Sequence, residues 1–220
     1  MVTKGPYMRR NINKCSSIFV FSCFQSTKWL GYIDPKIKIF EKNCSLNENL
    51  GCFDESFSYI SFIIKNYRKL DGKIIFTHGH ETSWHYKTPI QTQLKKVMAS
   101  SYYRNNSFGG IYCNTNTFFT LGSWSGNMGK TEEWYWEKMF EGTHLKKPNK
   151  FKYPCCGTFF VDSSLILKHK ITFYKKILEN MKNFEHAYKK KRLCGRVIEA
   201  AWATIFLGNK EYKKPPYCSF

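Results

Sequence analysis

Hydrophobic and polar positions in the first half of the chain switch between the period of a strand and that of a helix. The run Ile18–Phe24 is β-branched and aromatic, and Lys36–Phe40 alternates at period two, so both segments predict strands. Apolar residues then recur at helical spacing from Phe57 to Tyr67, and Asp71-Gly72 ends that predicted helix. Lys73–Thr77 predicts a third strand. Strands that alternate with helices are typical of an α/β sheet with parallel strands.

The second half of the chain predicts more helices than strands. Thr88 and Pro89 have the pattern of an N-cap followed by proline in the first helical turn. Further helices are expected at Glu132–Phe140, around Tyr174–Met181 and at Arg196–Leu207, and short strands at Gly109–Cys113, Thr117–Leu121 and Gly157–Val161. These elements fit a single α/β domain over residues 17–210 with a helical C-terminal end. A basic, flexible arm (residues 1–16) would precede it and a tail (residues 211–220) would follow.

The N-terminal region also has features of a secretion signal. Lys4, Arg9, Arg10 and Lys14 precede an apolar run about as long as a signal-peptide core. No small-x-small cleavage site follows, and the same run is equally suited to a buried first strand, which we favour. No stretch approaches the roughly 18 apolar residues that span a bilayer, so no transmembrane helix is expected.

Composition narrows the class of protein. Hydrophobic residues are 42%, aromatic residues 18% and charged residues 23%, which excludes a disordered, collagen-like or coiled-coil chain. Lys and Arg number 35 against 16 Asp and Glu, a formal net charge of +19. Such a field attracts nucleic acid, nucleotide-activated substrates or anionic lipid head groups. The alternative is that the lysines only solvate the surface and reflect A/T-rich codons.

Cysteine usage indicates a reducing compartment. The chain has 9 cysteines and no C-x-x-C pair, the spacing that zinc ribbons and thioredoxin-like sites require. The adjacent Cys155 and Cys156 cannot easily bond to each other within relaxed backbone geometry. Reduced thiols and a cytoplasmic location are therefore expected.

The best candidate for a site directly follows the third predicted strand, over Thr77–His85. In open α/β sheets, ligands bind outside the carboxyl ends of the strands. His78, His80 and His85, with the carboxylate of Glu81, can ligate a metal or exchange protons, and the glycine among them lets a ligand approach the backbone closely. The alternative is that one or two of these histidines only bond to loop backbone.

A known metallo-hydrolase pattern, H-x-H-x-D-H, also follows a strand. It requires Asp at position 82 and His at position 83, where this chain has Thr82 and Ser83. We therefore exclude that class of metal site.

Two carboxylates farther along the chain are candidate bases. Asp162 ends a predicted strand and precedes Ser163-Ser164, which is a plain helix-capping signal, although the strand end would also face the ligand cleft. Glu199 lies between Ile198 and the inward Ala201–Trp202 pair, so it is expected at a core edge with a pKa raised by burial. The alternative for Glu199 is a surface charge paired with a lysine.

Two further patterns have both a functional and a purely structural interpretation. The aromatic run Trp134-Tyr135-Trp136 would suit sugar or base stacking, but consecutive positions on a helix point in different directions, which favours core packing. The run Lys189–Arg192 would either grip phosphates or solvate a loop.

Four segments of the chain match motifs of a known family. They are Asn49-Leu50-Gly51 with Glu55 and Tyr59-Ile60, then Ile75–His80, then Cys155–Val161, and finally Gly195–Glu199 with Trp202. On these motifs the chain resembles a domain-of-unknown-function family of glycosyltransferase-like proteins from fungi, algae and large viruses. It is more distantly similar to a rhamnosyltransferase domain of an algal virus. The resemblance covers about residues 15–208.

The resemblance implies a nucleotide-sugar (GT-A-type) fold with a central mixed sheet, and transfer of a sugar from a nucleotide-diphosphate sugar to a hydroxyl acceptor. In that fold an Asp-x-Asp turn holds a divalent metal, Mn²⁺ or Mg²⁺, on the donor diphosphate. His78-Gly79-His80 stands at the corresponding turn here, so His78 and His80 become the candidate metal ligands. The segment near the nucleotide pocket also departs from the family pattern, as Cys23–Thr27.

The resemblance also implies roles for individual residues. Candidate substrate-binding residues are His78, Gly79, His80, Glu55, Trp84 and His85. Glu199 becomes the general base that takes the acceptor's proton, with Asp162 as the second choice. A different class of function stays open, in which a non-catalytic protein binds polyanions, either nucleic acid or an acidic glycan, on the same fold.

Overall fold

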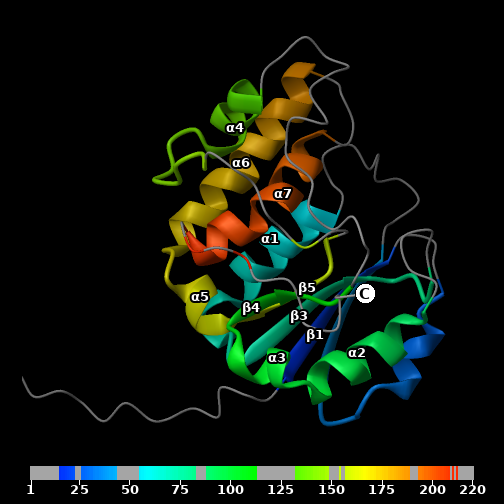
Figure 1. Ribbon diagram of the computed structural model, residues 1–220. Coiled ribbons are helices and arrows are strands. Elements are labelled where there is room, and N and C mark those ends of the chain that lie inside the picture. Colours follow the sequence, from blue (N-terminus) through cyan, green and yellow to red (C-terminus); the bar gives the residue numbers. More distant parts are fainter. Residues whose placement is uncertain are drawn as a thin grey trace, which may run out of the picture.

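A single mixed sheet lies at the centre of the computed structural model, which describes residues 15–22, 26–43, 55–82, 88–112, 132–148, 154, 157–188, 193–208, 210 and 212 (Figure 1). Its strands are β1 (Cys15–Ser22), β2 (Lys38–Asn43), β3 (Lys73–His78), β4 (Phe108–Gly110) and β5 (Phe159–Asp162), in the order β2-β1-β3-β5-β4. The pairs β1–β2 and β1–β3 are parallel, whereas β5 runs antiparallel to both β3 and β4.

The central strands are apolar on both faces, which is why they lie in the middle of the sheet. In β1, Phe19 and Phe21 belong to one buried cluster, and Ile18 and Val20 to the other. Successive side chains of a strand point to opposite faces, so this alternation provides each face of the sheet with its own core.

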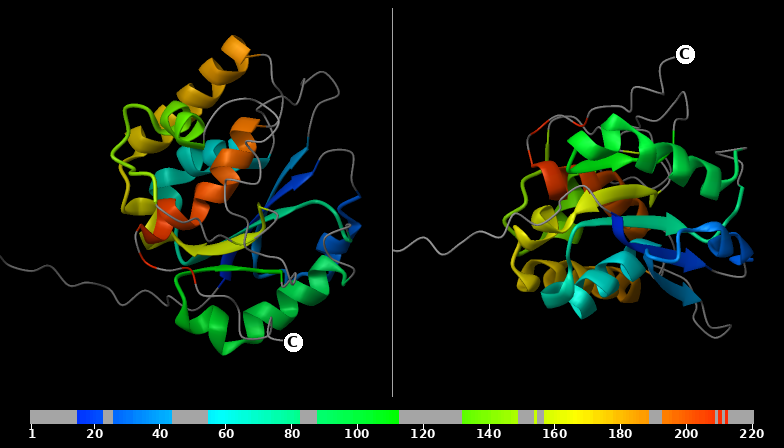
Figure 2. Two further views of the ribbon diagram at one scale, coloured as in Figure 1. Left: turned by 45° about the horizontal axis from the view of Figure 1, so that its top comes forward. Right: turned by 90° about the horizontal axis from the view of Figure 1, so that it is seen from below.

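Helices cover both faces (Figures 1 and 2). On one side lie α1 (Glu55–Asn66), α4 (Glu132–Phe140), α6 (Ile171–Tyr188) and α7 (Leu193–Leu207). On the other side lie the short η1 (Lys28–Tyr32), α2 (Ile90–Ala99) and α3 (Ser101–Asn105). The 3₁₀ turn η2 (Tyr67–Lys69) follows α1, and α5 (Ser163–Leu167) follows β5. The predicted α/β class with a helical C-terminal end is confirmed.

Most predicted elements occur with shifted ends. The three early strands, the α4 helix and the long C-terminal helix are present. Ala201 and Trp202, expected to face inward on the last helix, are both buried. The parallel arrangement predicted from the first half of the chain is confirmed for β1, β2 and β3. The antiparallel β5 makes the sheet mixed, as the family resemblance implied. Tyr135 and Trp136 are buried in the core, as the packing interpretation of the aromatic run predicted.

The expected limits of the domain also shift. β1 begins at Cys15, inside the segment predicted to be an arm. Tyr212 lies in the predicted tail, yet it is buried and its hydroxyl accepts a hydrogen bond from the Gly110 amide at 3.2 Å. The strand expected at Thr117–Leu121 lies outside the described residues. Of the helices described, none has the length and apolar character needed to span a membrane.

Candidate functional site

The turn after β3 lies where the strand order reverses. β2 is on one side of β1 and β3 is on the other, so the crevice outside the carboxyl ends of β1 and β3 is the topological switch point of the sheet. Residue His78 ends β3, and Gly79 and His80 follow it. The fold therefore puts the best sequence candidate at the position where α/β sheets bind ligands.

Two hydrogen bonds fix the backbone of this turn. The Gly79 amide donates to the Phe21 carbonyl at 2.8 Å, which extends the β1–β3 ladder by one bond. The indole Nε1 of Trp29 donates to the Gly79 carbonyl at 2.8 Å. Trp29 is 1% exposed, so this bond forms away from competing water. Sequence reasoning missed Trp29, because a tryptophan between strands is typical of ordinary core.

His78 faces α1 and meets its first residue. Ile74 and Phe76 point to that face of the sheet, and His78 follows at the same period. Its Nε2 lies 3.8 Å from Oε1 of Glu55, and the two side chains are about four-fifths buried, with exposures of 19% and 20%. Among the described residues, this Nε2 atom has no hydrogen-bond partner. A carboxylate in the first turn of a helix is favoured by the helix dipole, so Glu55 is stabilised where it stands.

Gly157 packs directly on this pair. Its φ is +56°, a conformation that favours glycine. A Cβ at this position would lie 3.1 Å from His78 Nε2 and 3.3 Å from Glu55 Cγ. Gly157, just before β5, therefore packs against His78 and Glu55. Because it has no side chain, it leaves room for both.

The second histidine of the turn lies beside the first. The ring centroids of His78 and His80 are 5.8 Å apart with an interplanar angle of 33°. Burial lowers the pKa of His80, the nearby His78 lowers it further, and Glu55 acts in the opposite direction. His80 is therefore neutral at physiological pH, so one ring nitrogen is able to donate and the other to accept.

Glu199 lies on the stripe of α7 that faces α1 and β5. Gly195, Glu199, Trp202 and Phe206 recur at intervals of four, three and four residues and so share one face of the helix. Ser56 Oγ donates to the Gly195 carbonyl at 3.0 Å, next to Glu55. Farther along the stripe, the ring of Trp202 packs 6.2 Å from that of Tyr59 and 5.3 Å from that of Phe159.

These contacts have a consequence for the predicted base. Glu199 is partly buried between the Gly195 and Trp202 contacts, on the side of the helix turned toward the start of α1 and the start of β5. Glu55, His78 and His80 thus lie together at one edge of the sheet, and the α7 stripe that carries Glu199 packs against the start of α1 beside Glu55.

Asp162 lies elsewhere, which corrects the expectation that it faces the same cleft. β5 is antiparallel to β3, and Asp162 pairs with Lys73, at the amino end of β3. Five residue steps of strand separate Lys73 from His78, a distance of about 16 Å at the usual rise. Asp162 is the N-cap residue of α5, as the capping signal predicted, but its carboxylate makes no cap bond and instead accepts from Lys73 Nζ at 2.7 Å.

Several predicted residues lie outside the described part of the chain. These are Trp84, His85, the Cys155–Cys156 pair and the run Lys189–Arg192. Within the described ranges, no group of three or more His, Cys, Asp or Glu side chains is placed to hold a metal ion.

The donor chemistry of the described site does not suit the expected cations. Mg²⁺ and Mn²⁺ prefer carboxylate, carbonyl and water oxygens. His78, His80 and Glu55 supply two imidazoles and a single carboxylate. These residues therefore do not fit a hard divalent cation.

Comparison with known proteins gives a family and no activity. The model of a family described as protein of unknown function (DUF3431) matches residues 27–219. No curated protein and no solved structure matches the chain.

Proposed function

Because this chain belongs to the DUF3431 family, whose description names no activity, we propose its function from the site: a glycosyltransferase-like enzyme that transfers a sugar from a nucleotide-diphosphate sugar to a hydroxyl acceptor. The observation that carries the proposal is the contact of Glu55 with His78 beneath Gly157, at the β1–β3 switch point. A mixed sheet with helices on both faces is compatible with the GT-A-type fold that the sequence motifs suggest.

The diphosphate of the donor is assigned to the turn and to the helix starts beside it. Helix N-termini present free backbone N–H groups and a partial positive charge, which favours phosphate. α1 and α7 begin next to each other here, as the Ser56–Gly195 hydrogen bond shows. Neutral His80 offers a further N–H to a phosphate oxygen, and His78 holds its place against Glu55.

Glu199 is proposed as the general base. Its carboxylate takes the proton of the acceptor hydroxyl while that oxygen bonds to the anomeric carbon. The bond between the anomeric carbon and the β-phosphate oxygen breaks, and the nucleoside diphosphate leaves with the electron pair. The histidine N–H groups and helix starts stabilise the charge that develops on this leaving group.

A donor panel tests the proposal directly. We expect one class of nucleotide-diphosphate sugar to raise the Tm, since a ligand that binds the native state stabilises it, and to release nucleoside diphosphate when an acceptor is present. The panel is run with and without Mn²⁺, so that a metal requirement is measured rather than assumed. A flat response to every donor, with and without metal, would contradict the proposal.

Substitution of the base separates catalysis from binding. Glu199→Gln should lower the rate of sugar transfer by at least about a hundredfold, because general-base catalysis contributes 10²–10⁴-fold to the rate. The donor-induced rise in Tm should remain. Glu179→Gln, which removes an exposed carboxylate on α6, is the matched control and should transfer at the normal rate. Normal transfer by Glu199→Gln would remove Glu199 from the mechanism.

A second candidate, polyanion binding, is favoured by the net charge of +19. This function predicts heparin or DNA binding that falls steeply with salt and no response to any donor.

A further inference from the structure

Exposed basic residues gather at the amino edge of the sheet, opposite the candidate site. They come from the start of β2, from η2 and from the connection between α5 and α6, which directly follows an exposed leucine at the end of α5. We call the following set the basic patch: Lys38, Arg68, Lys69, Leu167, Lys168 and Lys170.

The fold brings these segments together through several contacts. The hydroxyl of Tyr67 donates to the carbonyl of His169, so η2 lies against the end of α5. The Ser163 amide donates to the Gly72 carbonyl at 2.8 Å, which holds the start of α5 beside the turn that follows η2. Arg68 and Lys69 therefore lie near Lys168 and Lys170, although a hundred or so residues separate them in sequence.

Lys38 joins the patch across a shallow groove. The groove has a volume of about 190 Å³, and its lining includes both Lys38 and Lys69. β2 is parallel to β1, and β1 to β3, so Lys38 at the start of β2 lies at the same edge as Lys73 at the start of β3. Asp71 is the acidic residue that lines this groove. Lys38 and Lys69 of the patch thus share this groove with one carboxylate.

Leu167 distinguishes this patch from ordinary solvated lysines. Its exposed fraction is 37%, which places it among the few large apolar side chains on the described surface. An apolar side chain ringed by Lys and Arg is the combination that binds the surface of an anionic bilayer, where the cations meet lipid head groups and the apolar group enters the interface. Nucleic acid offers phosphates to the cations but no apolar layer to the leucine.

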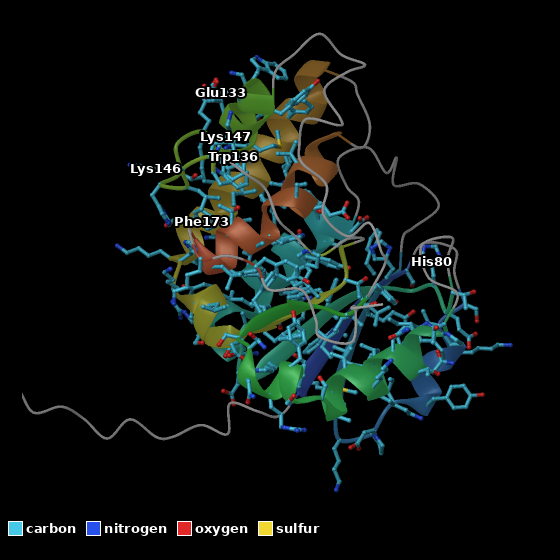
Figure 3. The ribbon with its side chains drawn as sticks, viewed as in Figure 1. His80, Glu133, Trp136, Lys146, Lys147 and Phe173 are labelled. Carbon is cyan, nitrogen blue, oxygen red and sulfur yellow. The ribbon has the colours of Figure 1, made fainter. Side chains whose placement is uncertain are left out.

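We propose that the basic patch docks the protein on an anionic membrane surface through Leu167 and the cations around it. Figure 1 shows α5 at the opposite end of the molecule from the carboxyl ends of β1 and β3. Figure 3 likewise shows His80 on the side opposite Phe173, a residue of α6 that packs on His169. A membrane-docked molecule therefore presents the candidate site to the aqueous phase. The docking proposal does not depend on the proposed enzymatic activity.

Vesicle flotation tests the proposal with defined lipids. The full chain should float with vesicles of phosphatidylcholine mixed with phosphatidylserine, should stay behind with vesicles of phosphatidylcholine alone, and should lose binding as salt rises. Arg68, Lys69, Lys168 and Lys170 are changed together to Gln. Each basic residue near such a surface contributes about five-fold to partitioning, so this variant should bind at least about a hundredfold more weakly.

A matched variant controls for total charge. It also replaces four exposed lysines by Gln, but on η1, α2 and the distal part of α6: Lys28, Lys95, Lys96 and Lys182. This variant should keep most of the vesicle binding. Leu167→Ser should weaken vesicle binding several-fold and leave binding to duplex DNA unchanged. All the substituted side chains are on the surface, and a thermal melt verifies that each variant is folded.

Three results would overturn the docking proposal. The first is no binding of the full chain to phosphatidylserine vesicles at low salt. The second is an equal loss of binding in the patch and control variants, which would mean that total charge alone attracts the protein. The third is tighter binding to duplex DNA than to vesicles, together with normal vesicle binding by Leu167→Ser, which would assign the patch to nucleic acid.

Discussion

A buried charge is costly unless an opposite charge lies beside it, and this rule explains Asp162. The side chains of Lys73 and Asp162 are 1% and 5% exposed, and their charged atoms lie 2.7 Å apart. The local sequence Asp162-Ser163-Ser164 predicted a helix cap, because a capping signal is read from neighbouring residues. The actual partner of Asp162 is 89 residues away along the chain, and only the antiparallel pairing of β5 with β3 brings it into contact.

Breaking this pair should cost much more than breaking a surface pair. We expect Asp162→Asn to lower the free energy of unfolding by about 3 kcal/mol, since it leaves the Lys73 ammonium buried without that carboxylate. The exposed pair Lys176–Glu179, with its charged atoms 3.3 Å apart, is the control, and Glu179→Gln should cost about 0–1 kcal/mol. Urea unfolding measures both.

The same variant tests where Asp162 acts. Because Asp162 lies about 16 Å from His78, Asp162→Asn should leave the donor-induced rise in Tm unchanged. If Asp162→Asn kept normal stability but lost donor binding, Asp162 would have to act in the candidate site.

At the scale of elements, the segment that enters β5 packs against the candidate site through Gly157. Gly157 combines a positive φ with close neighbours, whereas Gly208, after α7, has a φ of +64° and no described atom within 4 Å of the position that a Cβ would take. Substitution of Gly208 therefore tests backbone strain alone, whereas substitution of Gly157 tests strain together with crowding. An alanine in the left-handed region costs about 1–3 kcal/mol at either position.

Gly157→Ala should also displace His78 or Glu55, because its methyl group would lie 3.1 Å from the imidazole Nε2. We expect both Gly157→Ala and Gly208→Ala to lower the Tm, and Gly157→Ala alone to lose the donor-induced rise in Tm. Differential scanning fluorimetry with the donor found in the panel makes the comparison. Equal donor responses in the two variants would show that the crowding at residue 157 does not affect the site.

Local patterns predicted the elements well and their relations less well. Strand and helix periods identified β1, β3, α1, α4 and α7, since each buries a face that its own sequence displays. The alternating pattern of β2 also predicted a strand, although its Ile39 is 37% exposed. The direction of β5 is set by pairing with distant strands, so no local pattern contains it. The turn at His78–His80 was predicted because it follows a buried strand. The hydrogen bond from Trp29 to Gly79 joins residues 50 positions apart in the sequence, so no local motif indicates it.

At the scale of the whole molecule, His169 joins three parts of the helical layer. Its Nε2 lies 2.6 Å from the carbonyl oxygen of Ile205 on α7, and a carbonyl only accepts, so Nε2 carries the proton. Its Nδ1 then accepts from His144 Nε2 at 3.1 Å, in the segment that follows α4. Its ring stacks on Phe173 of α6, with centroids 4.3 Å apart. These bonds describe a neutral His169, and burial favours that form because it lowers the pKa of His169.

The lowered pKa of His169 predicts how stability depends on pH. Burial lowers the pKa of His169, His144 and Lys168 lower it further, and the bond to Ile205 acts in the opposite direction; burial also lowers the pKa of His80. Below the unfolded pKa of about 6.5, the unfolded chain binds protons that the folded chain does not, so stability falls as pH falls. The free energy of unfolding in urea should therefore be lower at about pH 5.5 than at about pH 7.5. His169→Gln should make that difference smaller, because the glutamine does not titrate, and His80→Gln should remove a separate share. If His169→Gln retained the full pH dependence, the proton-linked loss of stability would have to arise outside this junction.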